Sequence, residues 1–236
     1  MDTIRTRRIL AYLKAKKSCS VRELMDKFKA SSATIHRDLD TLSRSEYVER
    51  VRGGVIYNEA HDARNTKIAY SERVVSRHEA KAAIAAEALG LVGEDDIVFL
   101  DSSTTVFELA ARLAEAGPRR LTVVTNAIPV MNLFGKMPSE WALIGLGGNY
   151  DPQLNSVLGS ATLAELSRLN ITKAFVSAYG LDEKTATTNH ERQAELLRQV
   201  LDIADWRYLL VDGTKIGRKG LFRIAGRETF DAIVTK

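Results

Sequence analysis

Cysteine is almost absent from this sequence of 236 residues, in which Cys19 stands alone. One cysteine cannot form an internal disulfide or supply a zinc site with several thiolates, which excludes the disulfide-stabilised secreted class. Histidine is also scarce, and His61, His78 and His190 have no ligand-type partner one helical turn away. We therefore expect neither a metal site nor another cofactor.

Long apolar stretches are absent as well. No run approaches the ~18–20 uncharged apolar residues that a membrane-spanning helix needs. The N-terminus carries Arg5, Arg7 and Arg8 and lacks the long apolar segment and small-residue cleavage site of a signal peptide. We therefore expect a cytoplasmic protein that does not bind membranes.

The N-terminal quarter has little glycine or proline and an excess of positive charge. The first glycine is Gly53 and the first proline is Pro118. Residues 1–58 hold 13 lysines and arginines against 7 acidic residues, a net charge of +6, whereas residues 59–236 hold 21 against 23. Such a basic segment indicates an anionic partner, although a solvated helical surface is the alternative. We expect a domain over 1–58, a polar linker over 59–73 and a second domain over 74–236.

The first domain has the pattern of three short helices. Ser20 and Glu23 are spaced as a capping box at the start of the second helix, each side chain satisfying the other's backbone N–H group. Ser31 or Ser32 begins the third helix. The second and third helices each have apolar residues at the spacing of one buried face. The two apolar stripes are Val21, Leu24, Met25 and Phe28, and Ile35, Leu39 and Leu42.

The third helix presents small, hydroxyl and basic side chains opposite its apolar stripe. Two helices joined by a tight turn, followed by a strand pair with a Gly53-Gly54 turn, are typical of a winged helix-turn-helix that binds DNA. Arginine pairs with guanine, and hydroxyl groups bind phosphates or base edges. The alternative is a three-helix bundle with a solvated third helix. The predicted DNA contacts are Ser32, Ala33, Thr34, His36, Arg37, Arg44, Arg50 and Arg52.

The second domain alternates apolar runs with helical stretches, which indicates an α/β fold with a doubly wound, mainly parallel sheet. Strands are expected near 97–100, 121–124, 142–146, 174–176, 208–211 and 232–234, with helices near 79–89, 106–116, 161–169 and 192–204. Ligands bind such sheets at the carboxyl ends of the strands, where this chain collects polar residues and glycines. The candidate ligand-binding residues are Asp101, Ser102, Ser103, Thr104, Thr105, Thr125, Asn126, Gly147, Gly148, Gly180, Asp182 and Lys215.

The chemistry of these loops favours a phosphorylated sugar or polyol. Residues 101–105 open a helix, so their backbone N–H groups and hydroxyls suit an anion. Lys215 adds a positive charge, and Asp101 and Asn126 offer hydrogen bonds to hydroxyl groups. Neither the Walker A nor the dinucleotide-binding spacing is present. Helix caps with serine and threonine are common, so a purely structural reading of any single loop stays open.

The motifs together resemble those of the DeoR family of bacterial transcriptional regulators. They are Thr34-Ile-His-Arg-Asp-Leu39 in the third helix, with His36 where a second arginine is usual, and the segments 21–24, 52–54, 101–105, 125–126, 145–148, 180–182 and 211–217. The resemblance implies a winged helix-turn-helix joined to a sensor domain related in fold to ribose-5-phosphate isomerase. Such proteins usually repress sugar-catabolic operons, respond to a phosphorylated intermediate and form dimers or tetramers.

Two functional classes are open at this point. The first is a transcriptional regulator, a repressor of a carbohydrate catabolic operon that a phosphorylated sugar or polyol releases from operator DNA. The second is a phosphosugar isomerase-like enzyme with a regulatory N-terminal domain. Isomerisation needs a general base, and Asp182, the one candidate, lacks the denser acidic cluster that the isomerases carry. We therefore favour a non-enzymatic regulator that acts as a homodimer or homotetramer, with operator DNA and the effector as its partners.

Overall fold

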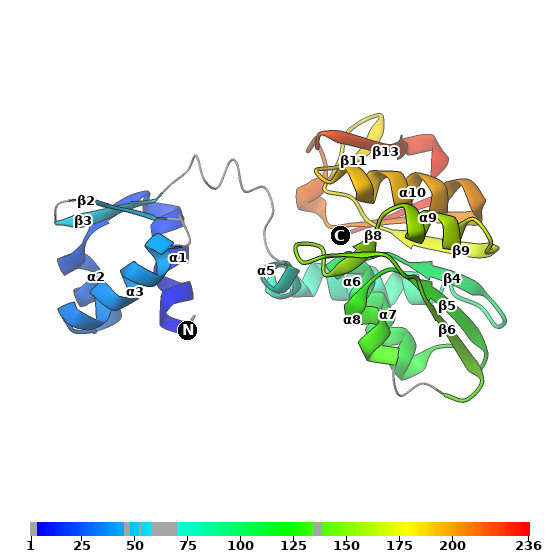
Figure 1. Cartoon of the computed structure of the whole chain (residues 1–236), viewed down its shortest axis with the longest axis horizontal. Coiled ribbons are helices and arrows are strands. Elements are labelled where there is room, and N and C mark those ends of the chain that lie inside the picture. Colours follow the sequence, from blue (N-terminus) through cyan, green and yellow to red (C-terminus); the bar gives the residue numbers. More distant parts are fainter. Residues whose placement is uncertain (1–3, 45–47, 52, 58–69, 135–137) are drawn as a thin grey trace. The chain divides into compact units, whose positions relative to one another are not determined.

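The computed structural model describes residues 4–44, 48–51, 53–57, 70–134 and 138–236 (Figure 1). The chain divides into two compact units, Met1–Thr66 and Lys67–Lys236. The expected domain end at residue 58 and most of the expected linker lie outside the described residues. Residues 70–73 of the expected linker are helical.

The N-terminal unit packs three helices against a three-stranded antiparallel sheet. Leu24, Ile35 and Leu39 are fully buried in its core, which confirms the two predicted apolar stripes. The sheet includes a strand of only three residues, Ser-Cys-Ser, whose composition carries no signal for it. The elements are α1 (Ile4–Lys16), β1 (Ser18–Ser20), α2 (Val21–Phe28), α3 (Ser32–Arg44), β2 (Val48–Val51) and β3 (Gly54–Tyr57).

The helix starts follow the expected capping chemistry in part. The Ser20 hydroxyl accepts a hydrogen bond from the Glu23 backbone N–H at 3.1 Å, and Ser31 does the same for Thr34 at 3.3 Å. The Glu23 carboxylate does not complete the capping box. It accepts hydrogen bonds from the Tyr12 hydroxyl and the Lys16 ammonium instead, so the reciprocal half of that prediction is wrong.

The turn between β2 and β3 depends on its glycines. Gly53 has a φ of +83°, in the left-handed region that glycine adopts without strain. A Cβ atom at Gly54 would lie 2.7 Å from the Cys19 carbonyl oxygen, because β1 pairs closely with β3 there. The predicted hairpin is therefore present, with a third strand fixed against it.

The C-terminal unit is built on a six-stranded parallel sheet in the order β14-β12-β9-β4-β5-β6. All six predicted strands are confirmed, since each apolar run forms one strand of this sheet. The strands are β4 (Ile97–Leu100), β5 (Leu121–Thr125), β6 (Trp141–Gly145), β9 (Ile171–Val176), β12 (Ala204–Val211) and β14 (Ala232–Thr235).

Helices cover both faces of the sheet, as Figure 1 shows. Leu166 and Leu197 fill the core on one face, and Ile84, Leu109 and Val130 fill the core on the other. The predicted doubly wound α/β class is thus confirmed. The helices are α5 (Tyr70–Val75), α6 (His78–Leu89), α7 (Thr104–Ala116), α8 (Ile128–Leu133), α9 (Ser160–Leu166) and α10 (Glu191–Ile203).

Short strands and 3₁₀ turns complete the unit. They include a hairpin and a small antiparallel sheet, ordered β10-β11-β13, that packs against α10. None of the helices in the described ranges is long and apolar enough to cross a membrane. These short elements are β7 (Asn149–Asp151), β8 (Ser156–Leu158), β10 (Gly180–Leu181), β11 (Thr185–Thr188), η2 (Gly213–Lys215), β13 (Phe222–Gly226) and η3 (Arg227–Thr229).

Candidate functional site

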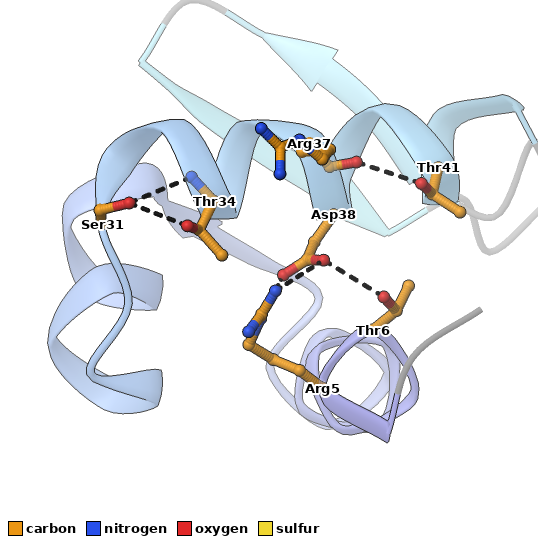
Figure 2. Close-up of polar contacts among 7 residues, drawn as sticks. All are labelled: Arg5, Thr6, Ser31, Thr34, Arg37, Asp38 and Thr41. Carbon is orange, nitrogen blue, oxygen red and sulfur yellow. Dashed lines mark hydrogen bonds and ion pairs between the residues drawn. The ribbon is translucent and has the colours of Figure 1, made fainter. Parts of the chain in front are cut away.

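The third helix of the N-terminal unit exposes most of its predicted contact residues. Ser32, Ala33 and Arg37 are exposed, whereas Thr34 and His36 are half-buried. The Thr34 hydroxyl is 2.8 Å from the Ser31 hydroxyl, so it also takes part in capping the helix (Figure 2). The backbone of Arg44 ends α3, and Arg52 lies outside the described residues.

The opposite side of α3 is tied to α1 by a buried carboxylate. Asp38 is only 5% exposed, and its Oδ2 atom accepts a hydrogen bond from Arg5 Nε at 2.5 Å. The other oxygen accepts bonds from Arg5 Nη2 at 3.3 Å and Thr6 Oγ1 at 3.4 Å (Figure 2). These contacts hold α3 against α1 and leave Arg37 pointing away from α1. The sequence gives one indication of this ion pair, because the acidic Asp38 directly precedes the buried Leu39.

The predicted wing residue Arg50 contacts the third helix. Its guanidinium donates hydrogen bonds to the Asp40 carboxylate and to His36 Nδ1. Arg50 was predicted to contact DNA, but in this structure its donors are directed at two side chains of α3.

In the C-terminal unit, the loop after β4 turns into the start of α7. Asp101 is buried, and its two oxygens accept backbone N–H bonds from Ser103 and Ser177, each at 2.8 Å. Burial raises the pKa of the Asp101 carboxyl, against the opposing effect of these hydrogen bonds. The Ser103 hydroxyl caps α7 by accepting a bond from the Val106 N–H at 3.1 Å. Asp101 therefore links the end of β4 to the end of β9 and also takes part in the loop after β4.

Several hydroxyl and amide groups near this loop are buried. Ser102 and Thr104 are at most 5% exposed. Thr125 bonds the Leu100 carbonyl at 2.7 Å, and Asn126 Nδ2 bonds the Val157 carbonyl at 3.1 Å. Among the residues that the structure describes, Thr105 Oγ1 and Asn126 Oδ1 are buried without a hydrogen-bond partner. A buried polar atom of this kind is costly unless something else binds it.

Lys215 lies at the end of β12 and faces the same region. Its ammonium is 3.1 Å from the Ser177 hydroxyl and 4.0 Å from an oxygen of Asp212. Only 21% of the side chain is exposed. Burial lowers the pKa of Lys215 to about 8, although the carboxylates of Asp212 and Asp101 act in the opposite direction.

Two further cations at this end of the sheet were not predicted from the sequence. Lys81, on α6, is 4% exposed, and its ammonium donates a hydrogen bond to the Arg73 carbonyl. Arg73, on α5, donates to the Gln153 carbonyl at 3.2 Å, and its guanidinium stands 5.5 Å from the Tyr70 ring centroid. The charges of Arg73 and Lys81 act on Lys215 and lower its pKa further. Lys81 has a sequence signal, because it is the first position of an apolar stripe that continues through Ile84, Ala85 and Ala88.

The remaining predicted ligand residues have structural roles. Gly147 donates its N–H to Glu165 at 2.8 Å, and a Cβ at Gly148 would lie 2.2 Å from the Thr162 hydroxyl. A Cβ at Gly180 would lie 2.3 Å from the Arg218 carbonyl oxygen. The Asp182 carboxylate accepts N–H bonds from Lys184 and Thr185, which lower its pKa and fix it in a turn.

Both units match known domains of one family. Residues 76–236 match the DeoR C terminal sensor domain, and residues 5–61 match the DeoR-like helix-turn-helix domain. The chain belongs to the DeoR family. This family consists of transcriptional regulators, so the protein is a regulator and not an enzyme, and the isomerase alternative is wrong. It binds DNA through the helix-turn-helix unit and its effector through the sensor unit.

Two relatives are similar to the chain over nearly its full length. The chain is 29% identical to the HTH-type transcriptional regulator IolR of Bacillus subtilis, over 100% of this chain and 91% of that protein. It is 28% identical to the lactose phosphotransferase system repressor of Lactococcus lactis, over 98% and 89% of the two chains. The ribose 5-phosphate isomerase A structure from Methanocaldococcus jannaschii aligns at a TM-score of 0.43 and 17% identity, over 60% and 55% of the two chains.

Proposed function

We propose that this DeoR-family regulator represses a carbohydrate catabolic operon and leaves its operator when a phosphorylated sugar or polyol binds the sensor unit. The observation that carries the proposal is the convergence of Arg73, Lys81 and Lys215 at the carboxyl end of the parallel sheet, beside the hydroxyl-rich loop 101–105. A role as repressor is supported by the similarity to the lactose phosphotransferase system repressor.

The charges of this cluster favour a phosphate group. The charges of Arg73 and Lys81 oppose the charged form of Lys215, whereas nearby carboxylates, including Asp101 and Asp212, favour it. Cations that repel one another in a buried position gain from a bound anion. Phosphate is the anion that suits ammonium and guanidinium groups together with the N-terminus of α7.

The uncharged part of the ligand is expected to carry several hydroxyl groups. Thr105 Oγ1 and Asn126 Oδ1 are buried and have no partner within the described part of the chain. A hydroxyl group both donates and accepts, so a polyol satisfies such atoms where an apolar ligand leaves them unpaired. This supports a phosphorylated sugar or polyol over inorganic phosphate alone.

A thermal-shift comparison of matched ligands tests the proposal. The full chain is heated with sugars and polyols, each in its phosphorylated and its free form. A ligand that binds the folded state raises its stability by RT ln(1 + [L]/Kd), about 2.7 kcal/mol at a hundredfold excess over Kd. We expect stabilisation by one or more phosphorylated compounds and none by their free forms. Equal stabilisation by both forms would rule out a phosphate site.

A matched pair of lysine variants locates the binding. Lys215→Met removes one cation of the cluster. Lys173→Met removes a lysine with a similar exposure, 18% against 21%, that pairs with Asp96 near the amino ends of the strands. We expect Lys215→Met to lose the ligand-induced shift and Lys173→Met to keep it. The same ligand should release operator DNA from Lys173→Met but not from Lys215→Met.

A further inference from the structure

The wing arginine Arg50 and the recognition-helix histidine His36 form a polar network on the DNA-binding unit. Arg50 lies on β2, and its guanidinium contacts Asp40 and His36 at the same time. Side chains of Arg50 and Asp40 are 38% and 51% exposed, so the network lies at the surface. His36 stands on α3 directly before the exposed Arg37. The network therefore joins the wing to the side of α3 that carries the predicted base contacts.

The chemistry of arginine fixes the protonation of His36 in this network. A guanidinium has five N–H donors and no acceptor, and it stays charged in proteins. Its hydrogen bond to His36 Nδ1 therefore requires Nδ1 to be the unprotonated acceptor. In the neutral imidazole the proton then resides on Nε2, for which the structure shows no partner among the described residues. His36 thus presents an N–H donor.

Asp40 explains why Arg50 stays in this position. Asp40 is exposed on α3, where an unpaired carboxylate would repel DNA phosphates. Arg50 neutralises this carboxylate and uses its other terminal nitrogen for His36. A guanidinium held by two side chains of α3 is directed away from a phosphate contact.

We propose that Arg50 is a positioning residue that fixes the Nε2–H tautomer of His36, and that His36 uses this donor to select a base with a major-groove acceptor. Guanine offers N7 and O6, adenine offers N7 and thymine offers O4, whereas cytosine presents only the N4 amino donor. His36 therefore selects against cytosine at the base it contacts. The wing contributes to sequence selectivity through this contact and not through a phosphate.

Base-preference profiling tests the proposal with the full chain and a randomised double-stranded DNA library. The variants are His36→Ala, Arg50→Met and the double variant. Arg8→Met is the matched control, because Arg8 is an exposed arginine of α1 and its loss changes the net charge equally. We expect His36→Ala to reduce discrimination against cytosine at one position at least about fivefold, the lower end of a single base-pair mismatch. Arg50→Met should weaken the same position, and the double variant should add little to His36→Ala.

The salt dependence of binding separates the two roles of Arg50. A phosphate contact contributes close to one unit to the slope of log K against log salt and affects all sequences equally. We expect parallel slopes for the parent and Arg50→Met. A slope reduced by about one, with an unchanged preference profile, would overturn the positioning role. An unchanged profile for His36→Ala would overturn the base contact.

The tautomer itself is measurable without DNA. Selective ¹⁵N labelling of histidine distinguishes a pyridine-like from a pyrrole-like ring nitrogen by NMR, and His36→Gln identifies the His36 signals. We expect only the Nε2–H form in the parent and in Arg8→Met, and both tautomers in Arg50→Met. A mixture of tautomers in the parent would contradict the proposal even if the variant fails to bind DNA.

Discussion

Because burial lowers the pKa of Lys215, its charge, and with it the affinity for the effector, should depend on pH. Its pKa is about 8, so the ammonium is charged at neutral pH and loses its proton as the pH rises further. Only the charged form attracts a phosphate. We therefore expect effector affinity to fall by up to tenfold per pH unit above pH 8, until the pKa of the complex is reached. Isothermal titration of the effector between pH 6.5 and 9.5 measures this fall. An affinity that is constant across this range would contradict a contact between Lys215 and the phosphate.

Arg37 is the residue whose loss should most directly relax operator selection. It is exposed on α3, and Figure 2 shows it on the side away from α1. If its guanidinium pairs with guanine, Arg37→Ala should cost about 1–3 kcal/mol and affect one or two base positions. Competition with single-base variants of the operator measures this. A loss shared equally by all sequences would assign Arg37 to a phosphate.

The sequence predicts contacts between residues that are close in the chain, but not contacts between residues that are far apart in it. Ser20 is correctly predicted as a cap, and Ser31 is one of the two predicted alternatives, because capping depends on neighbours within four residues. The contact of Arg50 with His36 was not predicted, because the two residues are 14 positions apart in the chain. Arg73 was missed for the same reason, since its partner Gln153 is 80 residues away.

One ion pair helps to fix the orientation of α3 on α1, beside the apolar core that the two helices share. Asp38 is buried, so Asp38→Asn replaces a charge-assisted bond with a weaker neutral one, and Arg5→Met leaves the carboxylate without its cation. Because Arg5 is 40% exposed, solvent screens the pair, and we expect either variant to weaken the protection of the α1 and α3 amides without unfolding the unit. Hydrogen exchange of α1 and α3 amides in the full chain measures it. The exposed Arg8→Met on the same helix should leave exchange unchanged, and equal exchange in all variants would contradict the role of the pair.

Helix α5 is expected to respond to the effector. Its carbonyl at Arg73 accepts a bond from Lys81, and its Arg73 side chain reaches Gln153 between β7 and β8. A phosphate that binds Lys81 competes with this carbonyl, so effector binding should alter the protection of α5. We expect changed hydrogen exchange of residues 70–75 on adding effector, and weaker effector binding by Arg73→Met. Unchanged exchange in α5 at saturating effector would exclude this helix from the response.

The regular elements follow from the sequence more fully than the short ones. Apolar runs such as Ile97–Leu100 predict buried parallel strands because both faces of the sheet are covered. Strands β7, β8, β10 and β11 have only two to four residues, so periodicity does not identify them. These short elements place the loops around the cation cluster, which explains why the site was predicted only in part.

In the whole molecule, the DNA-binding part and the sensor part of the chain differ in net charge. Residues 1–58 hold 13 basic and 7 acidic residues, whereas residues 59–236 hold 21 and 23. Positive charge is thus concentrated where DNA binds, and the sensor unit is free of a strong repulsion between copies. This distribution favours self-association through the sensor unit.

The last prediction is that the protein binds its operator as a dimer or larger assembly. One recognition helix reaches base edges with three or four side chains, and each base pair contributes about 1–3 kcal/mol of discrimination. A single helix is therefore too weak to select one site among the competing sequences of a genome, whereas two helices on paired half-sites double the discrimination. Sedimentation at micromolar protein should show a dimer or tetramer. Inserting about five base pairs between the half-sites turns them to opposite sides of the duplex and should abolish tight binding. A monomer that binds both operators equally well would contradict this, and it would require selectivity to come from one α3 and its wing alone.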